Sequence, residues 1–543
     1  MKLVYTAILT WSIFFALPTA AQKRAEKDSV IKGATIEITQ SYKPEVTHAP
    51  RPEPTPTLPP IDTSAPILQY NVPQQTLFFS YGSLPLRPLA LNILTAEEQF
   101  ANYVKLGGGN LSTLLLDAGI GSLHGKDYET AIRINHLSQS GNIKNQKVSL
   151  TGVDAEGSLH KNAKTFGARL GIHNNRYHYY GYDHNIYSYP INAVRQAFTT
   201  VELGLDMKND TDSAGKINYH PYITAYSFSE SSGSTSENSI KLGVPVVYDI
   251  DSNLQLYAAL NFTYTAYRGQ NNNIFQLAPG IRFRNGIFTG HASIAPTIGR
   301  TGKFYILPDA EVNFSIPGTQ FMFNAGWQGN LVQNSFRQLA TQNPYMSTVF
   351  AYPVMQTHTN EVFAGIKSNI GNHISFNGRV SWWQYNDLPL FINDTAGDGK
   401  NFRLLYDSKV NALGLTAGIR YQVAHIFSLG FSGQWMNFYN KSYSQLWHTP
   451  AVRFTGDLRA QPMKKLTVNA YLSFVDGIYA LEKGNNTTKI NPGLDIGAGA
   501  EYEIIKRVNI FLQANNLLNS RYQLWYGYEA FGFNIFGGAR VKF

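Results

Sequence analysis

The stretch LQLYAALNFTYT, residues 254–265, decides the fold of this protein. Its even positions, from Leu254 to Tyr264, are all apolar or aromatic, whereas its odd positions, from Gln255 to Thr265, are mostly polar or small. Successive side chains of a β-strand point to opposite faces of the sheet. An alternation with a period of two therefore predicts a strand with one apolar and one polar face.

Three further segments repeat this alternation, over residues 374–382, 427–435 and 466–474. Strands of about 9–12 residues match a tilted transmembrane strand, whereas strands of soluble proteins most often have about 5–6 residues. Trp327, Trp382 and Trp435 stand on apolar faces, as expected for aromatic girdles at the membrane interfaces. We therefore expect an all-β fold, a transmembrane antiparallel β-barrel, with a soluble β-sandwich as the alternative.

The composition indicates a surface that does not face bulk water. Of the 543 residues 15% are charged, compared with about 25% in ordinary soluble domains. The absence of cysteine excludes disulfides and Cys-ligated metals. The net charge of +9 comes from scattered Lys and Arg, so we expect a solvated or lipid-phosphate-facing surface and no nucleic-acid partner.

The N-terminus is typical of a secretory signal peptide. Lys2 precedes a mostly apolar run from Leu3 to Leu17, and small residues follow up to Ala21, after which we place the cleavage. A retained anchor is the alternative, although the run is shorter than the roughly 20 residues of a spanning helix. The predicted regions are a signal peptide at 1–21, a Pro-rich periplasmic or lumenal segment at 22–99 and an outer-membrane β-barrel at 100–543.

Short turns alternate with long loops when the chain is read backward from its end. Residues 505–506 and 371–372 predict tight turns, whereas residues 476–491 and 332–357 predict long loops. Outer-membrane barrels have short periplasmic turns and longer outer loops. We therefore expect the loops to face outward and both termini to lie in the periplasm.

The same alternation gives a count of about 22 strands. The first pair is expected near 101–109 and 112–122, because an outward strand and an inward strand must precede the one that begins near Asp127. If Gly107–Gly109 is instead a bulge inside a single strand, the count is 20.

The last strand alternates from Ile535 through Val541 and ends in the aromatic Phe543. This ending resembles the C-terminal signal of outer-membrane barrels. The resemblance implies that Val541 and Phe543 are recognised by the barrel assembly machinery.

Residues 44–60 contain seven prolines, which disfavour a packed helix or a central strand and favour extended polyproline II. The segment 22–99 is therefore a periplasmic linker, or an extended arm that enters the lumen or docks on a periplasmic partner. A barrel of about 22 strands encloses a lumen wide enough to need a plug. If the pore is closed, part of this segment or inward-folded loops must occlude it.

Residues 515–522, NNLLNSRY, followed by a Gly- and aromatic-rich loop and the final strand, resemble the last two strands of TonB-dependent receptors. Residues 36–46, 103–107 and 342–347 are similar to a group of TonB-receptor-like outer-membrane proteins of the Bacteroidota. The resemblance implies an outer-membrane barrel in solute uptake. Ordinary receptors have a larger plug domain than the segment 22–99 could form, so the chain is expected to lack one.

One short segment resembles a TonB box, which pairs its backbone with TonB by β-strand addition. It consists of Thr35, Ile36, Glu37, Ile38 and Thr39. The alternatives are a short docking strand for another periplasmic protein and a plain linker.

Motifs for catalysis and metal binding are sparse. The sequence has no Gly-x-Ser-x-Gly elbow, no His-Glu-x-x-His and no P-loop, so we expect no enzyme and no cofactor. The loop Asn393–Gly399 is rich in oxygen ligands but lacks the spaced third acid and the final Glu of a calcium loop. An ordinary exposed turn is therefore the preferred interpretation, and no metal site is predicted.

A cluster of tyrosines and histidines is expected at the outer end of one strand and in its loop. The candidate ligand contacts are Tyr177, Tyr179, Tyr180 and Tyr182, and the nearby histidines are His173, His178 and His184. These residues could form the outer aromatic girdle, contact a sugar or peptide ligand, or bind a metal.

Two classes of function follow. The first is an outer-membrane barrel, similar to TonB-dependent receptors, that transports or binds a solute. The alternative is a structural or assembly barrel that holds periplasmic or surface protein partners. Either barrel would contact outer-membrane lipid, lipopolysaccharide and the barrel assembly machinery, and the first would engage TonB or another periplasmic protein.

Overall fold

The computed structural model describes residues 102–209, 216–231, 235–348, 354–482 and 486–543. The predicted signal peptide, the Pro-rich segment and the TonB-box-like residues 35–39 lie outside the described residues. Among the described residues, no helix is both long enough and apolar enough to cross a membrane.

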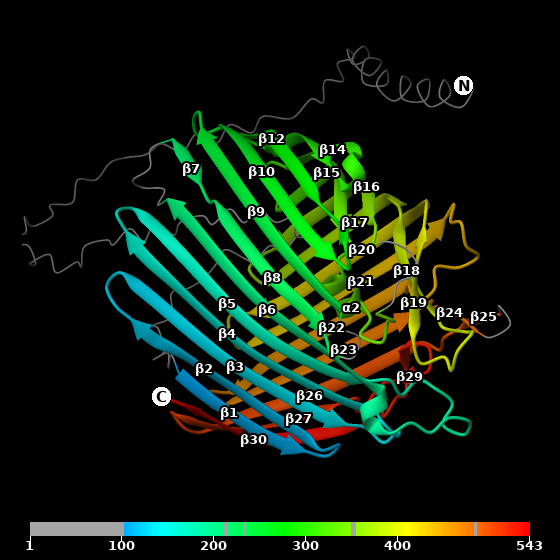
Figure 1. Cartoon of the computed structure of the whole chain (residues 1–543). Helices are drawn as coiled ribbons and strands as arrows, with labels where there is room; N and C mark the ends of the chain where they lie inside the picture. The colour runs from blue at the N-terminus through cyan, green and yellow to red at the C-terminus, as the bar shows by residue number, and fades with distance from the viewer. Residues whose placement is uncertain (1–101, 210–215, 232–234, 349–353, 483–485) are drawn as a thin grey trace, which may run out of the picture. The chain divides into compact units, whose positions relative to one another are not determined.

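The described residues form one closed antiparallel barrel of 22 strands, as predicted (Figure 1). The first eleven strands are β1 (Asn102–Gly109), β2 (Thr113–His124), β3 (Tyr128–Ser140), β4 (Lys147–Lys161), β5 (Lys164–His178), β6 (Arg195–Asn209), β7/β8 (Ile217–Tyr219 and Tyr222–Glu230), β9 (Thr235–Asp249), β10 (Leu254–Tyr267), β11/β12 (Gln270–Asn271 and Ile274–Asn285) and β13 (Phe288–Ile298). The next eleven are β14 (Phe304–Ser315), β15 (Phe321–Gln333), β16 (Gln356–Ile370), β17 (Ile374–Asn386), β20 (Val410–Val423), β21 (Phe427–Tyr439), β22 (Val452–Met463), β23 (Leu466–Asp476), β26 (Gly493–Ile505), β27 (Val508–Asn515) and β30 (Asn534–Lys542).

Two of these strands are interrupted. Both β7 and β8 pair with β9, and Pro221, which cannot donate a backbone hydrogen bond, lies between them. Both β11 and β12 pair with β10, and the pairing skips residues 272–273.

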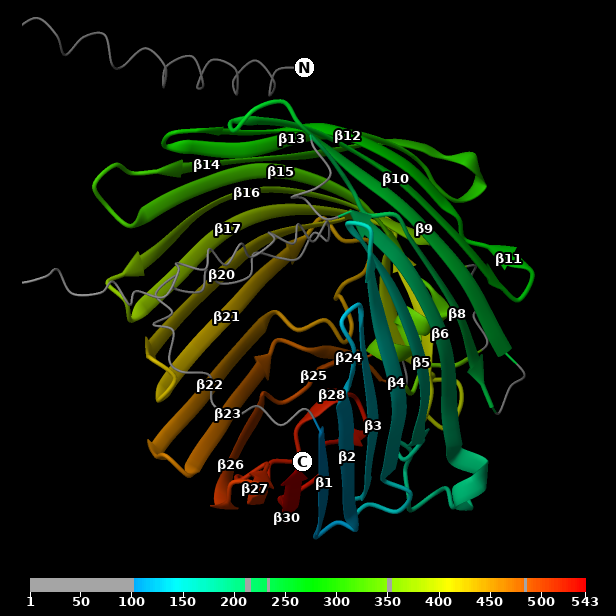
Figure 2. The ribbon, with the colours of Figure 1, turned by 90° about the vertical axis from the view of Figure 1, so that its left-hand side faces the viewer.

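The barrel closes between its first and last strands. β1 pairs with β30 from Tyr103 opposite Lys542 to Gly109 opposite Phe536, and Figure 2 shows the two strands side by side. Gly107–Gly109 form the end of β1, and β2 begins after a turn at residues 110–112. The prediction of two separate strands is therefore confirmed, and the 20-strand alternative is wrong.

The two ends of the barrel differ. At one end, which we call the turn end, most connections are tight, such as Asn162–Ala163, whose positive φ angles of 52° and 57° suit a two-residue hairpin. The backbone N–H of Phe543 donates to the carbonyl of Asn102 at 3.0 Å, so β1 begins and β30 ends at the turn end.

The opposite end, which we call the loop end, carries the long connections. They contain the helix α2 (Phe336–Gln342), the 3-10 turns η1 (Ile191–Val194) and η2 (Arg300–Gly302), and the hairpins β18–β19 (Leu388–Asn393, Phe402–Asp407), β24–β25 (Tyr479–Leu481, Thr487–Lys489) and β28–β29 (Gln523–Trp525, Tyr528–Glu529). These hairpins gather at one end of the barrel in Figure 1.

The strands have one apolar and one polar face, as the alternation predicted. Leu256, Trp327, Trp382 and Trp435 point outward and are 39–53% exposed. Trp383, next to Trp382, lines the lumen instead. A continuous apolar belt around a polar lumen suits a bilayer outside and water inside, which is the architecture of an outer-membrane barrel.

Candidate functional site

Three loops that start far apart on the barrel meet over the loop end of the lumen. Tyr180 follows β5, Tyr345 follows β15, and Tyr528 lies in the connection between β27 and β30. The rings of Tyr345 and Tyr528 stack with centroids 3.7 Å apart, and the ring of Tyr180 lies 4.8 Å from that of Tyr528. Because the three loops are rooted in different sectors of the wall, these contacts must span the mouth.

We call the loops that meet here the loop cap. They comprise the described residues of the connections 179–194, 334–348, 387–409, 440–451 and 516–533. Their common core contains Phe336, Leu339, Met346 and Phe402, each at most 1% exposed. This core packs against the inward-facing Phe198, Phe228 and Tyr267 at the loop ends of β6, β8 and β10.

The helix α2 is fixed to the wall through its N-terminus. Ser335 is the N-cap, and its hydroxyl accepts the backbone N–H of Gln338 at 3.1 Å. The carboxylate of Glu237 on β9 accepts the backbone N–H of Phe336 at 2.6 Å and the hydroxyl of Tyr226 at 2.8 Å. Negative charge at a helix N-terminus is favourable because the free N–H groups and the helix dipole are positive there.

A buried histidine joins three parts of the loop cap. Nδ1 of His448 donates to the carbonyl of Phe391 at 2.8 Å, and Nε2 accepts the backbone N–H of Tyr526 at 3.3 Å. The imidazole also lies against the rings of Phe402 and Trp525, with centroids 5.0 and 5.2 Å away. Burial lowers the pKa of His448 to about 4, so the ring is neutral at neutral pH.

A cavity of about 530 Å³, which we call the mouth pocket, lies beneath the loop cap. The barrel wall contributes Gln139, Tyr471, Asp495, Gln513, Asn515 and Asn534, and the loop cap contributes Tyr180, Tyr345, Tyr522, Trp525, Tyr528 and Glu529. The hydroxyl of Tyr522 donates to Asp495 at 3.2 Å, and that of Tyr471 donates to the same carboxylate at 3.4 Å. The pocket therefore combines aromatic rings with carboxamides and carboxylates.

The four tyrosines predicted to contact a ligand all lie at or in the loop cap, but only Tyr180 among them lines the mouth pocket. Tyr179 donates to the carbonyl of Met346 at 3.3 Å. Tyr182 accepts a hydrogen bond from Asn145 at 2.9 Å and is 5% exposed. The ring of Tyr177 packs edge-on against Tyr345, so these three residues hold loops together in this structure.

The neighbouring histidines do not converge. His173 pairs with Asp154 at 3.0 Å, His178 contacts the carbonyl of Lys147, and His184 contacts the carbonyl of Tyr180. Among the residues that the structure describes, no group of three His, Asp or Glu side chains could hold a metal ion.

The loop Asn393–Gly399 uses its carboxylates for contacts within the loop cap. Asp398 forms an ion pair with Lys400 and accepts the hydroxyl of Tyr189 at 2.7 Å. Asp394 lies 3.6 Å from the guanidinium of Arg403. Both acids thus have cationic partners.

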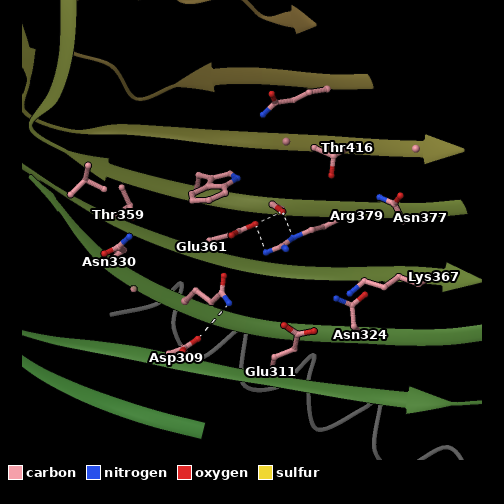
Figure 3. A pocket seen from close by; sticks show the side chains of 18 of the residues that line it. Asp309, Glu311, Asn324, Asn330, Thr359, Glu361, Lys367, Asn377, Arg379 and Thr416 are labelled. Carbon is pink, nitrogen blue, oxygen red and sulfur yellow. Dashed lines mark hydrogen bonds and ion pairs between the residues drawn. The ribbon is translucent and has the colours of Figure 1, made fainter. Parts of the chain in front are cut away.

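Deeper in the barrel, a groove of about 1320 Å³ runs along the lumenal face of the wall between β8 and β22 (Figure 3). Its closest ion pair joins Arg379 on β17 to Glu361 on β16 at 2.7 Å, and Ser381 also donates to that carboxylate. Arg420 and Asp457 form a second pair at 2.9 Å. Both signs of charge therefore line this groove, as in a water-filled lumen.

Sequence reasoning missed both cavities, although a signal for them exists. Asp495 lies on a lumenal position between the outward-facing Leu494 and Ile496, and Glu361 lies next to the outward-facing Val362. Charged or amide residues at lumenal positions of alternating strands could thus have indicated the lining. Among the loop residues, only Tyr180 was indicated locally, by the cluster of tyrosines and histidines, and nothing local indicates the others that complete the mouth pocket.

No protein-family model and no curated protein sequence matches the chain. Solved structures do match. The FrpB iron transporter of Neisseria meningitidis has a TM-score of 0.62 at 12% identity, with 82% of each chain covered. The siderophore receptor PirA of Acinetobacter baumannii has a TM-score of 0.62 at 8% identity, covering 81% of this chain and 80% of that one.

A mutant of the ferric enterobactin receptor PfeA of Pseudomonas aeruginosa, in complex with enterobactin, has a TM-score of 0.61 at 10% identity, with 81% of each chain covered. These TM-scores establish a shared fold, and sequence identities this low establish nothing beyond the fold. The part of the chain that the structure describes therefore has the barrel fold of TonB-dependent outer-membrane receptors, as the sequence resemblance implied.

Proposed function

We propose that this protein is an outer-membrane barrel that binds or transports a solute, as TonB-dependent receptors do. The observation that carries this proposal is the closed 22-strand barrel with an apolar belt outside and two solute-sized cavities on its lumenal side. The similar structures are an iron transporter and siderophore receptors, which supports a role in solute binding or uptake. The proposal includes no catalytic step.

The proposed orientation places the loop end outside the cell and the turn end, with both termini, in the periplasm. It rests on the short turns and long loops, which outer-membrane barrels place on the periplasmic and outer sides respectively. Lipid and lipopolysaccharide would surround the belt. The assembly machinery would read the end of β30, where Val541 and Phe543 are 43% and 54% exposed.

Conductance and solute flux test this function. The purified full-length protein in a planar bilayer should conduct weakly, because the loop cap spans the mouth. A variant with residues 336–347 replaced by a short Gly-Ser linker should conduct more and admit polar solutes into liposomes. Equal and negligible flux through both proteins would contradict a solute pathway on this side of the barrel.

A second proposal is that the N-terminal segment, residues 22–99, occludes the lumen. If it occludes the lumen, deletion of residues 22–95 should raise the conductance of the variant in which residues 336–347 are replaced, because the loop cap no longer limits the current there. If the deletion changes neither the conductance nor any protein contact, the segment is a plain linker.

TonB engagement is proposed through Thr35–Thr39. A strand added to TonB needs its backbone donors, so Ile36→Pro should abolish TonB binding while leaving barrel assembly intact. Purified TonB in a pull-down is the measurement, and Lys32→Ala outside the segment is the matched control. Undiminished binding of Ile36→Pro would contradict this role.

The loop cap also supports a second candidate, a structural or assembly barrel. A mouth spanned by a packed aromatic core suits a protein that holds partners as well as one that opens for a solute. This candidate predicts stable partners that copurify with the protein, and no flux even when residues 336–347 are replaced.

A further inference from the structure

We infer that the mouth pocket binds a neutral, hydroxyl-rich ligand of the carbohydrate class. This inference rests on the proposed solute-binding function and names the class of solute. Charge, hydrogen-bonding capacity and aromatic surface each contribute to it.

The charge of the lining disfavours an anionic ligand. The described lining residues include the carboxylates of Asp495 and Glu529 but no Lys or Arg. Glu529 has a distant ion-pair partner in Arg521, at 3.8 Å, whereas the hydrogen bonds to Asp495 come from two tyrosine hydroxyls. A cleft lined by one sign of charge concentrates ligands of the other sign and repels its own.

The lumen groove shows that this lack of cations is specific to the pocket. Arg379, Arg420 and Lys367 all line the groove, so the same lumen does present cations elsewhere. A ferric catecholate carries negative charge and would find complementary groups in the groove and none among the described residues of the pocket.

The carboxamides of the pocket favour a ligand that both donates and accepts hydrogen bonds. Gln139 and Asn515 both donate to the side-chain oxygen of Asn534, at 3.2 and 3.4 Å, and Gln513 donates to that of Asn515 at 3.1 Å. Each carboxamide has two N–H donors and one carbonyl acceptor, and each sugar hydroxyl can likewise donate and accept. A compact cation could use only the acceptors, so the amide N–H groups would contribute nothing to its binding.

Aromatic rings are the third feature of the mouth pocket that suits a carbohydrate. Tyr522 and Trp525 from the loop cap border the same cavity as the carboxamides. The negative face of an aromatic ring attracts the polarised C–H groups of a pyranose ring, as it attracts the edge of another aromatic ring. The volume of about 530 Å³ lies within the range of about 300–1,000 Å³ typical of small-molecule sites.

The test uses the full-length protein in detergent on an array of neutral and acidic glycans, with ferric enterobactin as an anionic comparison. We expect a neutral glycan to bind at least about tenfold more tightly than its uronic-acid or sulfated forms and than ferric enterobactin. Gln513→Ala should weaken that binding about tenfold. Gln461→Ala, which changes a glutamine at the turn end of β22 that lines neither cavity, should not weaken it.

Charge reversal at Asp495 provides a second test, in which a gain of affinity is expected as well as a loss. Asp495→Lys should weaken binding of the neutral glycan and raise the affinity for its uronic-acid form. The heat-dependent gel shift of folded barrels should show that each variant is assembled. No binding of any neutral glycan, tighter binding of ferric enterobactin, or equal binding by wild type and Gln513→Ala would each overturn the inference.

The outcomes also separate this inference from the proposed function. If ferric enterobactin binds more tightly than any neutral glycan, the pocket assignment fails and a solute-binding barrel survives. If no solute binds and none crosses the membrane in the flux assay, both fail.

Discussion

The barrel wall and the loop cap bury opposite kinds of side chain. The wall turns its large apolar residues outward, so that Leu415 is 46% exposed, and keeps ion pairs such as Arg379–Glu361 inside. The loop cap does the reverse, with Phe336 and Phe402 fully buried in an aromatic core. The wall is thus organised for lipid outside and water inside, whereas the loop cap has the core of a water-soluble protein.

This difference means that the two regions depend on different forces. Backbone hydrogen bonds around a closed ring hold the wall, and lipid covers its apolar belt. Burial of aromatic side chains away from water holds the loop cap. We therefore expect changes in the loop cap to loosen the mouth without unfolding the barrel, and changes on the belt to do the opposite.

The largest effect is expected at the centre of the loop cap. Phe402→Ala should destabilise the closed loops by about 3–5 kcal/mol, because it removes a fully buried ring and leaves a cavity. Limited proteolysis should cleave the loops faster than in the wild type, while the heat-dependent gel shift of the barrel stays unchanged. Phe431→Ala on the outward face is the control and should leave the loops protected. Unchanged protection in Phe402→Ala would contradict the aromatic core.

A charge on the belt should act on the wall alone. Leu415→Arg should cost about 2–4 kcal/mol if the site is near the bilayer midplane, because the guanidinium enters lipid. Thr416→Arg, one residue along the same strand, faces the lumen groove and should be nearly silent. Urea unfolding in liposomes compares the two. Equal losses in the free energy of unfolding would show that the lipid-facing and lumen-facing sides of the strand are assigned wrongly.

Acid should open the loop cap through His448. Its pKa is about 4 in the folded loops and about 6.5 when they open, so the open state binds the proton more readily. The contribution of the neutral ring is therefore complete above pH 6.5 and is lost as the pH falls toward 4, by on the order of 3 kcal/mol. Protease sensitivity of the loops should rise over this range. His448→Gln should remove that rise, and an identical pH profile in the variant would refute the role of His448.

The smallest effect is expected at the helix cap. Ser335→Ala should cost about 1 kcal/mol, because the N–H of Gln338 loses its acceptor while Glu237 still holds the first turn. Hydrogen exchange of the α2 amides should accelerate several-fold. Ser335→Asp keeps an acceptor and should exchange like the wild type. Acceleration in both variants would indicate that the cap is not responsible.

The wall was predictable because its signal is local. Period-two alternation around Leu256 identifies a strand and its lipid face, and the spacing of turns gives the count of strands. The loop cap was not predictable, because Tyr180, Tyr345 and Tyr528 are far apart in the sequence and come together only when the ring closes. The mouth pocket depends on both kinds of information, since the smaller part of its lining follows strand parity and the larger part depends on the meeting of the loops.

The meeting of the loops is tested most directly by a crosslink across the mouth. The chain has no cysteine, so Tyr345→Cys with Tyr528→Cys gives a single thiol pair, whose parent rings stack at 3.7 Å. Ser432→Cys with Thr455→Cys, directly opposite on neighbouring strands, is the positive control, and Tyr345→Cys with His373→Cys at the turn end is the negative control. A short bis-methanethiosulfonate should crosslink the 345–528 pair in intact outer membranes as completely as the positive control. A yield no greater than that of the negative control would contradict a mouth spanned by its own loops.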